Sequence, residues 1–371
     1  MKEIKNIIDA YHQIDFSQHK VALATVVRVE GSSYRRAGAR MLISDSGEWV
    51  GGISGGCLEG DALKRARFAI AQNKASVVTY DTSEDDPYQI GVGLGCNGII
   101  DVLLTPLDVE NPNNQVLALQ QCVESRKPEV LVTVTKLRME TDAIQLGDTF
   151  HFESANQFES IFPLKEISEE LLSDIQDGLI STKSSIKSYS LEDGTIQLFI
   201  EVLIPATHLL VYGGNYDIYP MVKLAKEIGW KVSVICNPLK VQKQLFTWAD
   251  AVIEKENAKN IAIDPYTVAI LMAHDYNTDF TNLRHLLSTE IPYIGMLGPK
   301  KRSDKMFKAM AEEGESVSEK DAARIASPVG LDIGANTPEE IAISILAEIK
   351  TIFSKRSGER LKFRDKPIYE V

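Results

Sequence analysis

The segment Gly51–Asp61, which reads GGISGGCLEGD, combines a thiol with a backbone that a ligand can approach closely. Glycine has no Cβ to hold a ligand away from the backbone N–H groups, and Gly55 and Gly56 directly precede Cys57. Apolar residues with helical spacing follow, so Cys57 is predicted at a helix N-terminus, where the helix dipole favours a thiolate. Two carboxylates within the next four residues oppose that effect. The alternative is a buried structural cysteine.

A second glycine-rich segment, Gly91–Gly98, carries another thiol. It reads GVGLGCNG, with Gly95 directly before Cys96, and a strand is expected to follow. The two thiols can converge on one site, and paired thiolates suit molybdenum, sulfur transfer or another soft metal. A structural zinc site is disfavoured because neither segment contains a histidine. The alternative is that both segments are tight turns in which the cysteines are incidental.

The segment Gly31–Arg40, which reads GSSYRRAGAR, offers positive charge directly after a predicted strand. Arg35 and Arg36, with Arg40, suit contact with an anion such as a phosphate, and the small residues expose backbone N–H groups. The same run also fits an ordinary basic surface turn, since charged runs are usually solvated. The segment by itself leaves both interpretations open.

Composition indicates a globular chain of two domains in the cytoplasm. Of 371 residues, 44% are hydrophobic and 25% are charged, and the formal net charge is -12. Nucleic acid is not an expected partner, because binding it requires clustered lysine and arginine. No segment has the pattern of a signal peptide or a membrane span. The four cysteines form no Cys-x-x-Cys pair, which predicts reduced thiols and core roles for Cys122 and Cys236.

The first half of the chain is predicted to be rich in strands. The strands are expected over Lys20–Glu30, Ala39–Ile43, Trp49–Ile53, Ser76–Tyr80, Ile99–Thr105, Val130–Lys136 and Gln197–Ile204. Helices are expected over Met1–Phe16 and about Leu58–Asn73, where apolar residues recur at helical spacing. The stretch Ser154–Ser190 is polar and acidic, and it is predicted to be peripheral and variable in structure.

Strands and helices alternate after Pro205, which is typical of a doubly wound parallel sheet. The strands are expected over His208–Val211, Lys231–Cys236, Ala251–Ile253, Thr267–Ala273 and Pro292–Met296. We therefore predict an α/β chain, with a strand-rich α+β domain over residues 1–204 and a Rossmann-like domain over residues 205–371.

The last helix has a strong start signal. Thr337 at the cap, proline at the first helical position and glutamate at the third together favour a helix that begins there. Its buried stripe is predicted to consist of Ile341, Ile345, Ile349 and Ile352.

The turn after the first strand of the second domain only partly matches the dinucleotide-binding fingerprint G-x-G-x-x-G. Gly213 fits the first place and Gly214 follows it, but Asn215 and Ile218 occupy the two later glycine places. After the second strand, Asn237 stands where an acidic residue should hold a ribose hydroxyl. Gly213 and Gly214 remain candidates for ligand contact, whereas an NAD(P) site is disfavoured.

Two further polar groups follow strands of the same predicted sheet. His274 comes directly after one strand. The basic run Lys300–Arg302 comes after another, where it can open a helix. A helix start with basic side chains suits an anion, and a solvated helix start fits the run equally well.

Several of these segments together resemble one known family. GSSYRRAGARMLISDSGEWVGGISGGCLEGD, followed by DTSEDDPYQIGVGLGCNG, resembles the N-terminal domain of the XdhC/CoxI family. PYIGMLGPKKR and SPVGLDIGANTPEEIAISILAEI resemble its C-terminal segments. The resemblance covers roughly Val21–Thr105 and His208–Ile352 and is specific, because several motifs occur in the same order.

The resemblance implies a maturation factor rather than a turnover enzyme. Members of this family bind molybdenum cofactor (molybdopterin), protect it and pass it to a xanthine-dehydrogenase-type apoenzyme. They are also linked to sulfuration of the cofactor with a cysteine desulfurase. By matching motifs, Cys57 and Cys96 would contact the cofactor, and Arg35 and Arg36 would contact its phosphate. The resemblance also implies a homodimer.

Two other functions stay open, and both would use the Rossmann-like domain. An NAD(P)-dependent oxidoreductase requires an intact glycine fingerprint and a ribose-binding acid, and both are degraded here. A nucleotide-binding assembly protein requires neither redox chemistry nor thiols. Nucleotide titration separates it from the maturation factor, because only the maturation factor depends on Cys57 and Cys96.

Overall fold

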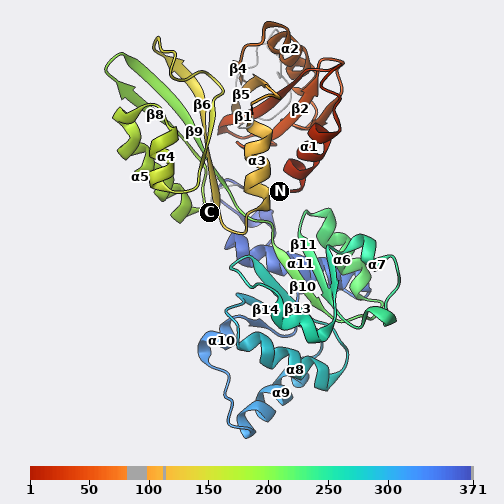
Figure 1. Cartoon of the computed structure of the whole chain (residues 1–371). Coiled ribbons are helices and arrows are strands. Elements are labelled where there is room, and N and C mark those ends of the chain that lie inside the picture. The colour runs from red at the N-terminus through yellow and green to blue at the C-terminus, as the bar shows by residue number, and fades with distance from the viewer. Residues whose placement is uncertain (82–97, 112–113, 369–371) are drawn as a thin grey trace. The chain divides into compact units, whose positions relative to one another are not determined.

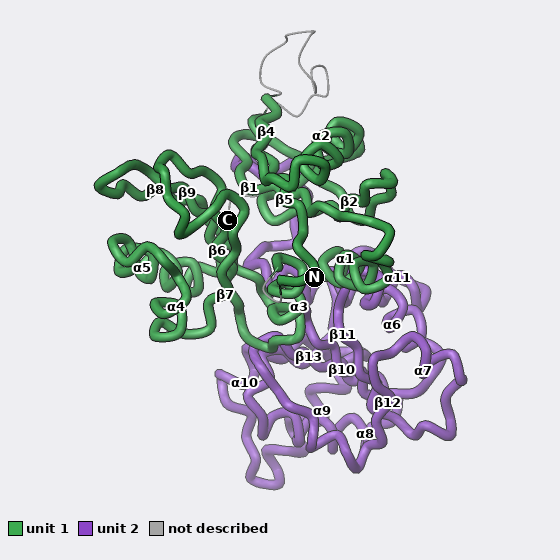
Figure 2. The backbone as a smooth tube through the Cα atoms, turned by 45° about the horizontal axis from the view of Figure 1, so that its top comes forward, with its two compact units in different colours: residues 1–205 green, residues 206–371 purple. Residues whose placement is uncertain are grey.

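The computed structural model describes residues 1–81, 98–111 and 114–368, and the chain divides into two compact units. Unit 1 comprises residues 1–205 and unit 2 comprises residues 206–371 (Figure 2). Among the described residues, no helix is both long and apolar enough to cross a membrane.

Unit 1 contains a five-stranded antiparallel sheet (Figure 1). Across the sheet, its strands are β3 (Trp49–Gly51), β2 (Arg40–Ser44), β1 (Val21–Gly31), β5 (Gly98–Pro106) and β4 (Ser76–Asp81). Helix α2 (Glu59–Gln72) packs on one face, while α1 (Lys2–Gln13) and α3 (Gln115–Glu124) pack on the other. Successive side chains of a strand point to opposite faces. The start of β1 is therefore buried on both sides, which explains its continuous apolar sequence.

A second antiparallel sheet of unit 1 has four strands. Their order is β7 (Thr149–Phe152), β6 (Glu129–Arg138), β9 (Gly194–Leu203) and β8 (Ser185–Leu191). Helices α4 (Ala155–Ile161) and α5 (Ser168–Ser181), joined through the 3-10 turn η1 (Lys165–Ile167), pack against it.

Residues 154–190 were predicted to be peripheral and variable in structure, and the structure shows that they include helices with a buried face. Phe158, Phe162, Leu171 and Ile175 are fully buried in the core between these helices and the four-stranded sheet. A helix that packs on one side needs only a narrow apolar stripe. The many polar residues between these four side chains concealed that stripe in the sequence.

Unit 2 is a six-stranded parallel sheet with helices on both faces. Across the sheet, its strands are β12 (Ala251–Ile253), β11 (Lys231–Ile235), β10 (His208–Tyr212), β13 (Thr267–Leu271), β14 (Tyr293–Met296) and β15 (Ile325–Ala326). Numbered along the chain, the strand order is 3-2-1-4-5-6, which is the order of a Rossmann fold. The predicted fold class is confirmed: an α+β unit with antiparallel sheets precedes a doubly wound parallel sheet.

The helices of unit 2 form two layers. One layer contains α6 (Ile218–Glu227), α7 (Leu245–Trp248) and α11 (Pro338–Ser354). The other contains α8 (Tyr276–Leu287) and α9 (Lys300–Glu312). The short elements are α10 (Glu319–Ala323) and the 3-10 turns η2 (Pro238–Lys240), η3 (Lys255–Asn260) and η4 (Leu361–Phe363).

Helix α11 begins where the sequence predicted, but its buried stripe is narrower. Ile345 and Ile349 are buried and Ile341 is half-buried, whereas Ile352 is 46% exposed. Positions 341 and 352 differ by only about 20° around a helix of 3.6 residues per turn. Both therefore lie at the rim of the buried face, and including Ile352 in the stripe was wrong.

Candidate functional site

The motif segments of unit 1 meet at one edge of the five-stranded sheet. Strand β1 ends at Gly31, which pairs with Gly98 at the start of β5, and β4 ends alongside. Helix α2 begins at the same edge, because the Tyr80 hydroxyl at the end of β4 donates to Oδ2 of Asp61 at 2.9 Å. The end of β1, the start of β5 and the turn before α2 therefore come together.

Two glycines show how closely these segments pack. A Cβ at Gly98 would lie 2.3 Å from the carbonyl oxygen of Ser32, so no side chain fits there. A Cβ at Gly55 would lie 3.5 Å from the ring of Tyr34. The segment after β1 thus contacts both the start of β5 and the glycine-rich turn. Two other sequence-based candidates, Gly95 and Cys96, lie outside the described residues.

The glycine-rich turn before α2 already binds a carboxylate, that of Glu59. The carboxylate accepts backbone N–H hydrogen bonds from Ile53 at 3.1 Å, Ser54 at 2.8 Å and Leu58 at 3.2 Å. The Ser54 hydroxyl donates to the same carboxylate and accepts from the N–H of Cys57 at 3.1 Å. Converging backbone N–H groups make an anion site, and here a side chain of the turn supplies the anion.

Hydrogen bonding keeps Glu59 charged. Burial disfavours the charged form, but hydrogen bonds from the Ser54 hydroxyl and from backbone N–H groups outweigh it and hold the pKa of Glu59 below its ordinary value of 4.5. The sequence suggested only that this carboxylate opposes a thiolate. The available signal was a serine and a glutamate on either side of a predicted helix start, a pattern related to helix capping.

Cys57 is the most accessible of the three cysteines that the structure describes. It is half-buried, and its Sγ lies 3.4 Å from Oγ of Ser54. Cys122 and Cys236 are each 2% exposed. Burial raises the pKa of both thiols, and with the charges of Glu129 and Glu201 it raises that of Cys122 to about 12. Their burial agrees with the predicted core roles, because buried apolar surroundings make a thiol unreactive.

The arginines after β1 differ in their availability. Arg35 forms an ion pair with Glu3 of α1. Arg40 is 4% exposed, and both its terminal nitrogens donate to the buried carboxylate of Glu201 on β9, Nη1 at 2.9 Å from Oε1. The Arg40–Glu201 pair therefore links the two sheets of unit 1. Arg36 is exposed, whereas Arg35 is half-buried.

In unit 2, close packing explains the glycines after β10. A Cβ at Gly213 would lie 2.4 Å from the carbonyl oxygen of Met272, and one at Gly214 would lie 3.2 Å from a side chain that follows β11. Asn215, in the place of the second fingerprint glycine, donates from Nδ2 to a carbonyl after β13 at 3.2 Å. Ile218, in the place of the third, is fully buried.

A cleft of about 680 Å³ lies at the carboxyl ends of these strands, where a Rossmann fold binds its ligand. The polar residues that line it include Asn215, Asn237, Lys240, Lys255 and Asp275. Oδ1 of Asn237 accepts the N–H of Leu239 at 3.0 Å and caps a short turn. The position of the ribose-binding acid therefore holds a neutral side chain whose oxygen is already used.

A histidine–aspartate pair lies at the same edge, and the sequence pointed only to the histidine. Nε2 of His274, just after β13, lies 2.5 Å from Oδ2 of Asp217, at the start of α6. His274 has a φ of 58°, which is uncommon for a residue with a Cβ. Asp217 is 8% exposed, and among the described residues its Oδ1 has no hydrogen-bond partner. The pair was hidden because its members lie 57 positions apart.

The aspartate bears directly on dinucleotide binding. In a dinucleotide site, the start of the first helix presents backbone N–H groups to the pyrophosphate. Here the carboxylate of Asp217 lies at that helix start, and its negative charge repels a phosphate. With Asn215, Ile218 and Asn237 at the other key positions, the residues at this edge of the sheet do not fit NAD(P).

The basic residues at the start of α9 differ in their surroundings. Nη2 of Arg302 donates at 2.7 Å to Asp279, a buried residue of α8. Burial raises the pKa of Asp279 despite this arginine. Lys300 and Lys301 are exposed. The run is therefore partly structural and partly solvated.

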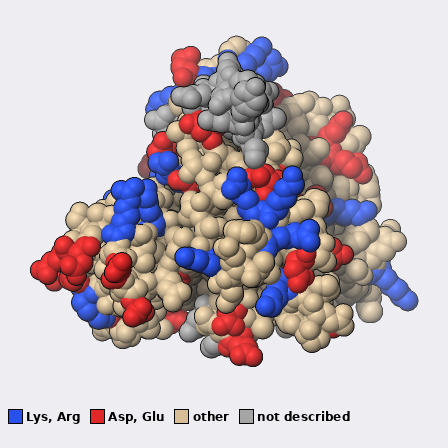
Figure 3. All heavy atoms as spheres, turned by 90° about the horizontal axis from the view of Figure 1, so that it is seen from above, with Lys and Arg blue, Asp and Glu red and all other residues tan. Residues whose placement is uncertain are grey.

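Charged side chains of both signs are mixed on the face shown in Figure 3. Lysine and arginine form no extended field on this face within the described part of the chain. In the same described ranges, no three His, Cys, Asp or Glu side chains gather as a metal site.

These folds and segments define a family. Residues 17–81 match the XdhC and CoxI family, and residues 209–349 match the XdhC Rossmann domain. A relative from Bacillus subtilis (strain 168), named as a probable xanthine dehydrogenase subunit, is 31% identical over 336 residues, which are 90% of this chain and 93% of that protein. The chain belongs to the XdhC and CoxI family.

Two further comparisons extend over both units. The molybdenum cofactor insertion chaperone PaoD of Escherichia coli (strain K12) is 23% identical over 330 residues, 89% of this chain and 82% of that protein. A crystal structure described as a xanthine dehydrogenase from Bacillus halodurans matches with a TM-score of 0.70 and 27% identity. The match covers 99% of this chain and 98% of that chain.

Proposed function

We propose that the chain binds molybdenum cofactor and assists its insertion into a xanthine-dehydrogenase-type apoenzyme. The observation that carries the proposal is the edge of unit 1, where the most accessible described thiol lies in a turn that binds an anion. A soft thiol beside backbone N–H groups suits a cargo that combines molybdenum with a phosphate. The names of the two relatives, one an insertion chaperone and one a probable dehydrogenase subunit, support the same role.

The residues at this edge have distinct proposed roles. Cys57, with Cys96 as a second thiol, contacts the cofactor. Gly55, Gly56 and Gly95 let the backbone approach it. Arg36 meets the phosphate, and Arg35 can do so only if its ion pair with Glu3 opens. Because Glu59 occupies backbone N–H groups of the turn, an anionic part of the cargo competes with its carboxylate.

Two partners and an oligomeric state also belong to the proposal. A cysteine desulfurase supplies sulfur for the sulfuration of the bound cofactor, and the apoenzyme then receives it. The chain acts as a homodimer, which is the commonest assembly of soluble proteins. Motifs shared with the family support these three points.

The test is a binding titration with anaerobically released molybdenum cofactor. The native protein is expected to bind it. Cys57→Ala and Cys96→Ala are each expected to weaken binding by about tenfold or more. Cys236→Ala, which removes a thiol from unit 2, serves as the control, and thermal unfolding checks that every variant is folded. Equal binding by all variants would show that the two thiols do not contact the cofactor. No binding by the native protein would overturn the proposal.

The cleft of about 680 Å³ in unit 2 supports a second candidate function, a nucleotide-binding assembly protein. In that case Gly213 and Gly214 border the ligand. Nucleotide binding that persists in Cys57→Ala, without binding of molybdenum cofactor by the native protein, would favour this candidate. An NAD(P)-dependent oxidoreductase is not proposed, because the residues at that edge of the unit 2 sheet do not fit that cofactor.

A further inference from the structure

The loops that follow β10 and β13 pack against each other at the point where the strand order of the unit 2 sheet reverses. The chain places β11 and β12 on one side of β10 and then returns to place β13 on the other side. Doubly wound sheets bind their ligands at such a reversal. Gly213 and Ala273, one from each loop, line the cleft of about 680 Å³. A reactive side chain on these loops would therefore be close to a bound ligand.

Three contacts fix the loop after β13. Oδ1 of Asp279 accepts the N–H of Ala273 at 3.1 Å, and Nδ2 of Asn215 donates to the carbonyl of Ala273 at 3.2 Å. The carboxylate of Asp217 holds the ring of His274, whose backbone has a φ of 58°. Such a backbone conformation persists only where the surroundings impose it, and it is concentrated at functional sites. Asn215 and Asp217 belong to the degraded glycine fingerprint, so the residues that oppose dinucleotide binding also position His274.

The contact with Asp217 leaves the second ring nitrogen of His274 available as a proton acceptor. A carboxylate only accepts hydrogen bonds, so Nε2 carries the hydrogen in its 2.5 Å contact with Oδ2 of Asp217. Nδ1 of the neutral ring then has the lone pair, and no described residue hydrogen-bonds to it. The side chain of His274 is 49% exposed and that of Asp217 is 11% exposed. A carboxylate behind an accessible imidazole fixes the ring and stabilises the imidazolium when the ring takes up a proton.

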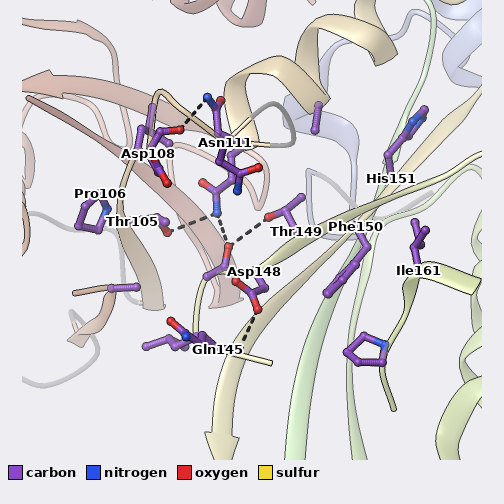
Figure 4. A pocket seen from close by; sticks show the side chains of 18 of the residues that line it. Thr105, Pro106, Asp108, Asn111, Gln145, Asp148, Thr149, Phe150, His151 and Ile161 are labelled. Carbon is purple, nitrogen blue, oxygen red and sulfur yellow. Dashed lines mark hydrogen bonds between the residues drawn. The ribbon is translucent and has the colours of Figure 1, made fainter. Parts of the chain in front are cut away.

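Two other histidines of the described chain form ion pairs with carboxylates, but neither combines an accessible ring with a buried acid. His19 contacts Asp45, whose side chain is 38% exposed. His151 lies in the wall of a cleft of unit 1 (Figure 4), and its side chain is only 13% exposed. Its two ring nitrogens lie 2.9 Å and 3.7 Å from carboxylate oxygens, so both face an acid. The arrangement at His274 is therefore not a general feature of the histidines in this chain.

We propose that His274 is a catalytic base of a second site, which activates a hydroxyl group of a neutral ligand or of water. Nδ1 takes the hydroxyl proton as the hydroxyl oxygen forms a bond to an electrophilic carbon, and Asp217 stabilises the imidazolium. The proton then passes to the displaced group, which returns the ring to its neutral form. A phosphate at this position is disfavoured, because the negative charge of Asp217 repels it. The site lies in unit 2 and does not depend on cofactor binding at Cys57.

The first test is steady-state hydrolysis of p-nitrophenyl acetate by the full chain, with water as the hydroxyl group. Water adds to the ester carbonyl, its proton passes through Nδ1 to the departing p-nitrophenolate, and acetic acid is formed. The native protein is expected to exceed the rate in buffer by at least about tenfold, and His274→Asn to lower the protein-dependent rate by about tenfold or more. His12→Asn is the control, because His12 is exposed and bonds to the neutral amide of Gln120. Equal rates for His274→Asn and the native protein would overturn the proposal, as would a native rate no higher than that in buffer.

Asp217→Asn tests the positioning role of the carboxylate with a side chain of the same size. The substitution is expected to lower the rate of ester hydrolysis by about tenfold or more, because the amide no longer stabilises the imidazolium. It should also change the pH dependence of the rate, which a purely structural defect would not do. Thermal unfolding establishes that each variant is folded. A folded Asp217→Asn protein with the native rate and pH dependence would refute the role of this carboxylate.

Diethyl pyrocarbonate gives a test that requires no variant, because it acylates unprotonated imidazole nitrogens that solvent can reach. Mass spectrometry of the native protein follows the modification of each histidine over time. His274 is expected to react faster than His12, whose ring has no carboxylate behind it. Slower modification of His274 than of His12 would show that Nδ1 is not an accessible base, and the proposal would fail.

Discussion

Glu59 stabilises the glycine-rich turn in a way that depends on pH. Its pKa is depressed in the folded chain, so its contribution is fully present above the ordinary value of 4.5. That contribution is lost as the pH falls through the lower, folded-state pKa and the carboxylate takes up a proton. Glu59→Gln is therefore expected to lower the free energy of unfolding at pH 7 by about 1 kcal/mol, and the difference from the native protein should shrink below pH 4.5.

Urea unfolding at a series of pH values measures this difference. Glu48→Gln is the control, since Glu48 is exposed in the preceding hairpin and its replacement should change stability by less than about 0.5 kcal/mol. A difference for Glu59→Gln that stays constant down to low pH would show that its carboxylate is not held as an anion by the turn.

His274 and Asp217 should be energetically coupled. Asparagine tolerates a positive φ but is too short to replace the imidazole, so His274→Asn leaves a buried carboxylate without its partner. We expect this substitution to cost about 1–3 kcal/mol of unfolding free energy. Combined with Asp217→Asn, the two changes should be non-additive by about 1 kcal/mol or more.

A double-mutant cycle by urea unfolding measures this coupling. His285→Asn, in the last turn of α8, gives the control cycle with Asp217→Asn, and its two changes should add within about 0.5 kcal/mol. Additivity in the His274 cycle as well would mean that the 2.5 Å contact contributes nothing measurable.

Elements with a continuous or strongly capped pattern could be placed from the sequence. Strands β1 and β10 are buried on both faces, so each reads as an unbroken apolar run. The start of α11 is marked by threonine, proline and glutamate at fixed offsets. Helices α4 and α5 were missed, because polar residues separate their few buried side chains. These side chains can be recognised as core residues only once the sheet that they pack against is known.

The candidate sites also differ in how far their residues could be recognised from the sequence. The glycine-rich segment around Cys57 could be found because its residues are neighbours in sequence. The partners of Arg40 and His274, by contrast, depend on pairing between distant strands and helices. No local pattern encodes such contacts.

The cap of α11 should contribute measurably to the stability of unit 2. Oγ1 of Thr337 accepts the N–H of Glu340 at 3.3 Å, and Oε2 of Glu340 accepts the N–H of Thr337 at 3.1 Å. Thr337→Ala removes the first of these bonds and should lower the free energy of unfolding by about 1 kcal/mol. Ser354→Ala, at the other end of the helix, is the control in the same urea experiment. Equal effects of the two substitutions would contradict a special role of the cap.

Each buried cluster of the described chain draws its residues from a single unit. A chain segment with its own sheet and core can in general fold alone. We therefore expect fragments 1–205 and 206–371 to be folded when produced separately, each with one cooperative thermal transition. This experiment also tests the domain boundary predicted from the sequence near residue 204.

The fragments separate the proposed functions of the two units. Fragment 1–205 contains Cys57, Cys96 and the turn that holds Glu59, so it is expected to retain the affinity of the full chain for molybdenum cofactor within about threefold. Fragment 206–371 contains the cleft beside His274 and is expected to bind none. Titration of both fragments, with circular dichroism to establish that each is folded, measures this division. A folded fragment 1–205 that has lost the cofactor would show that the site requires residues of unit 2, and the assignment of the binding edge to unit 1 alone would then fail.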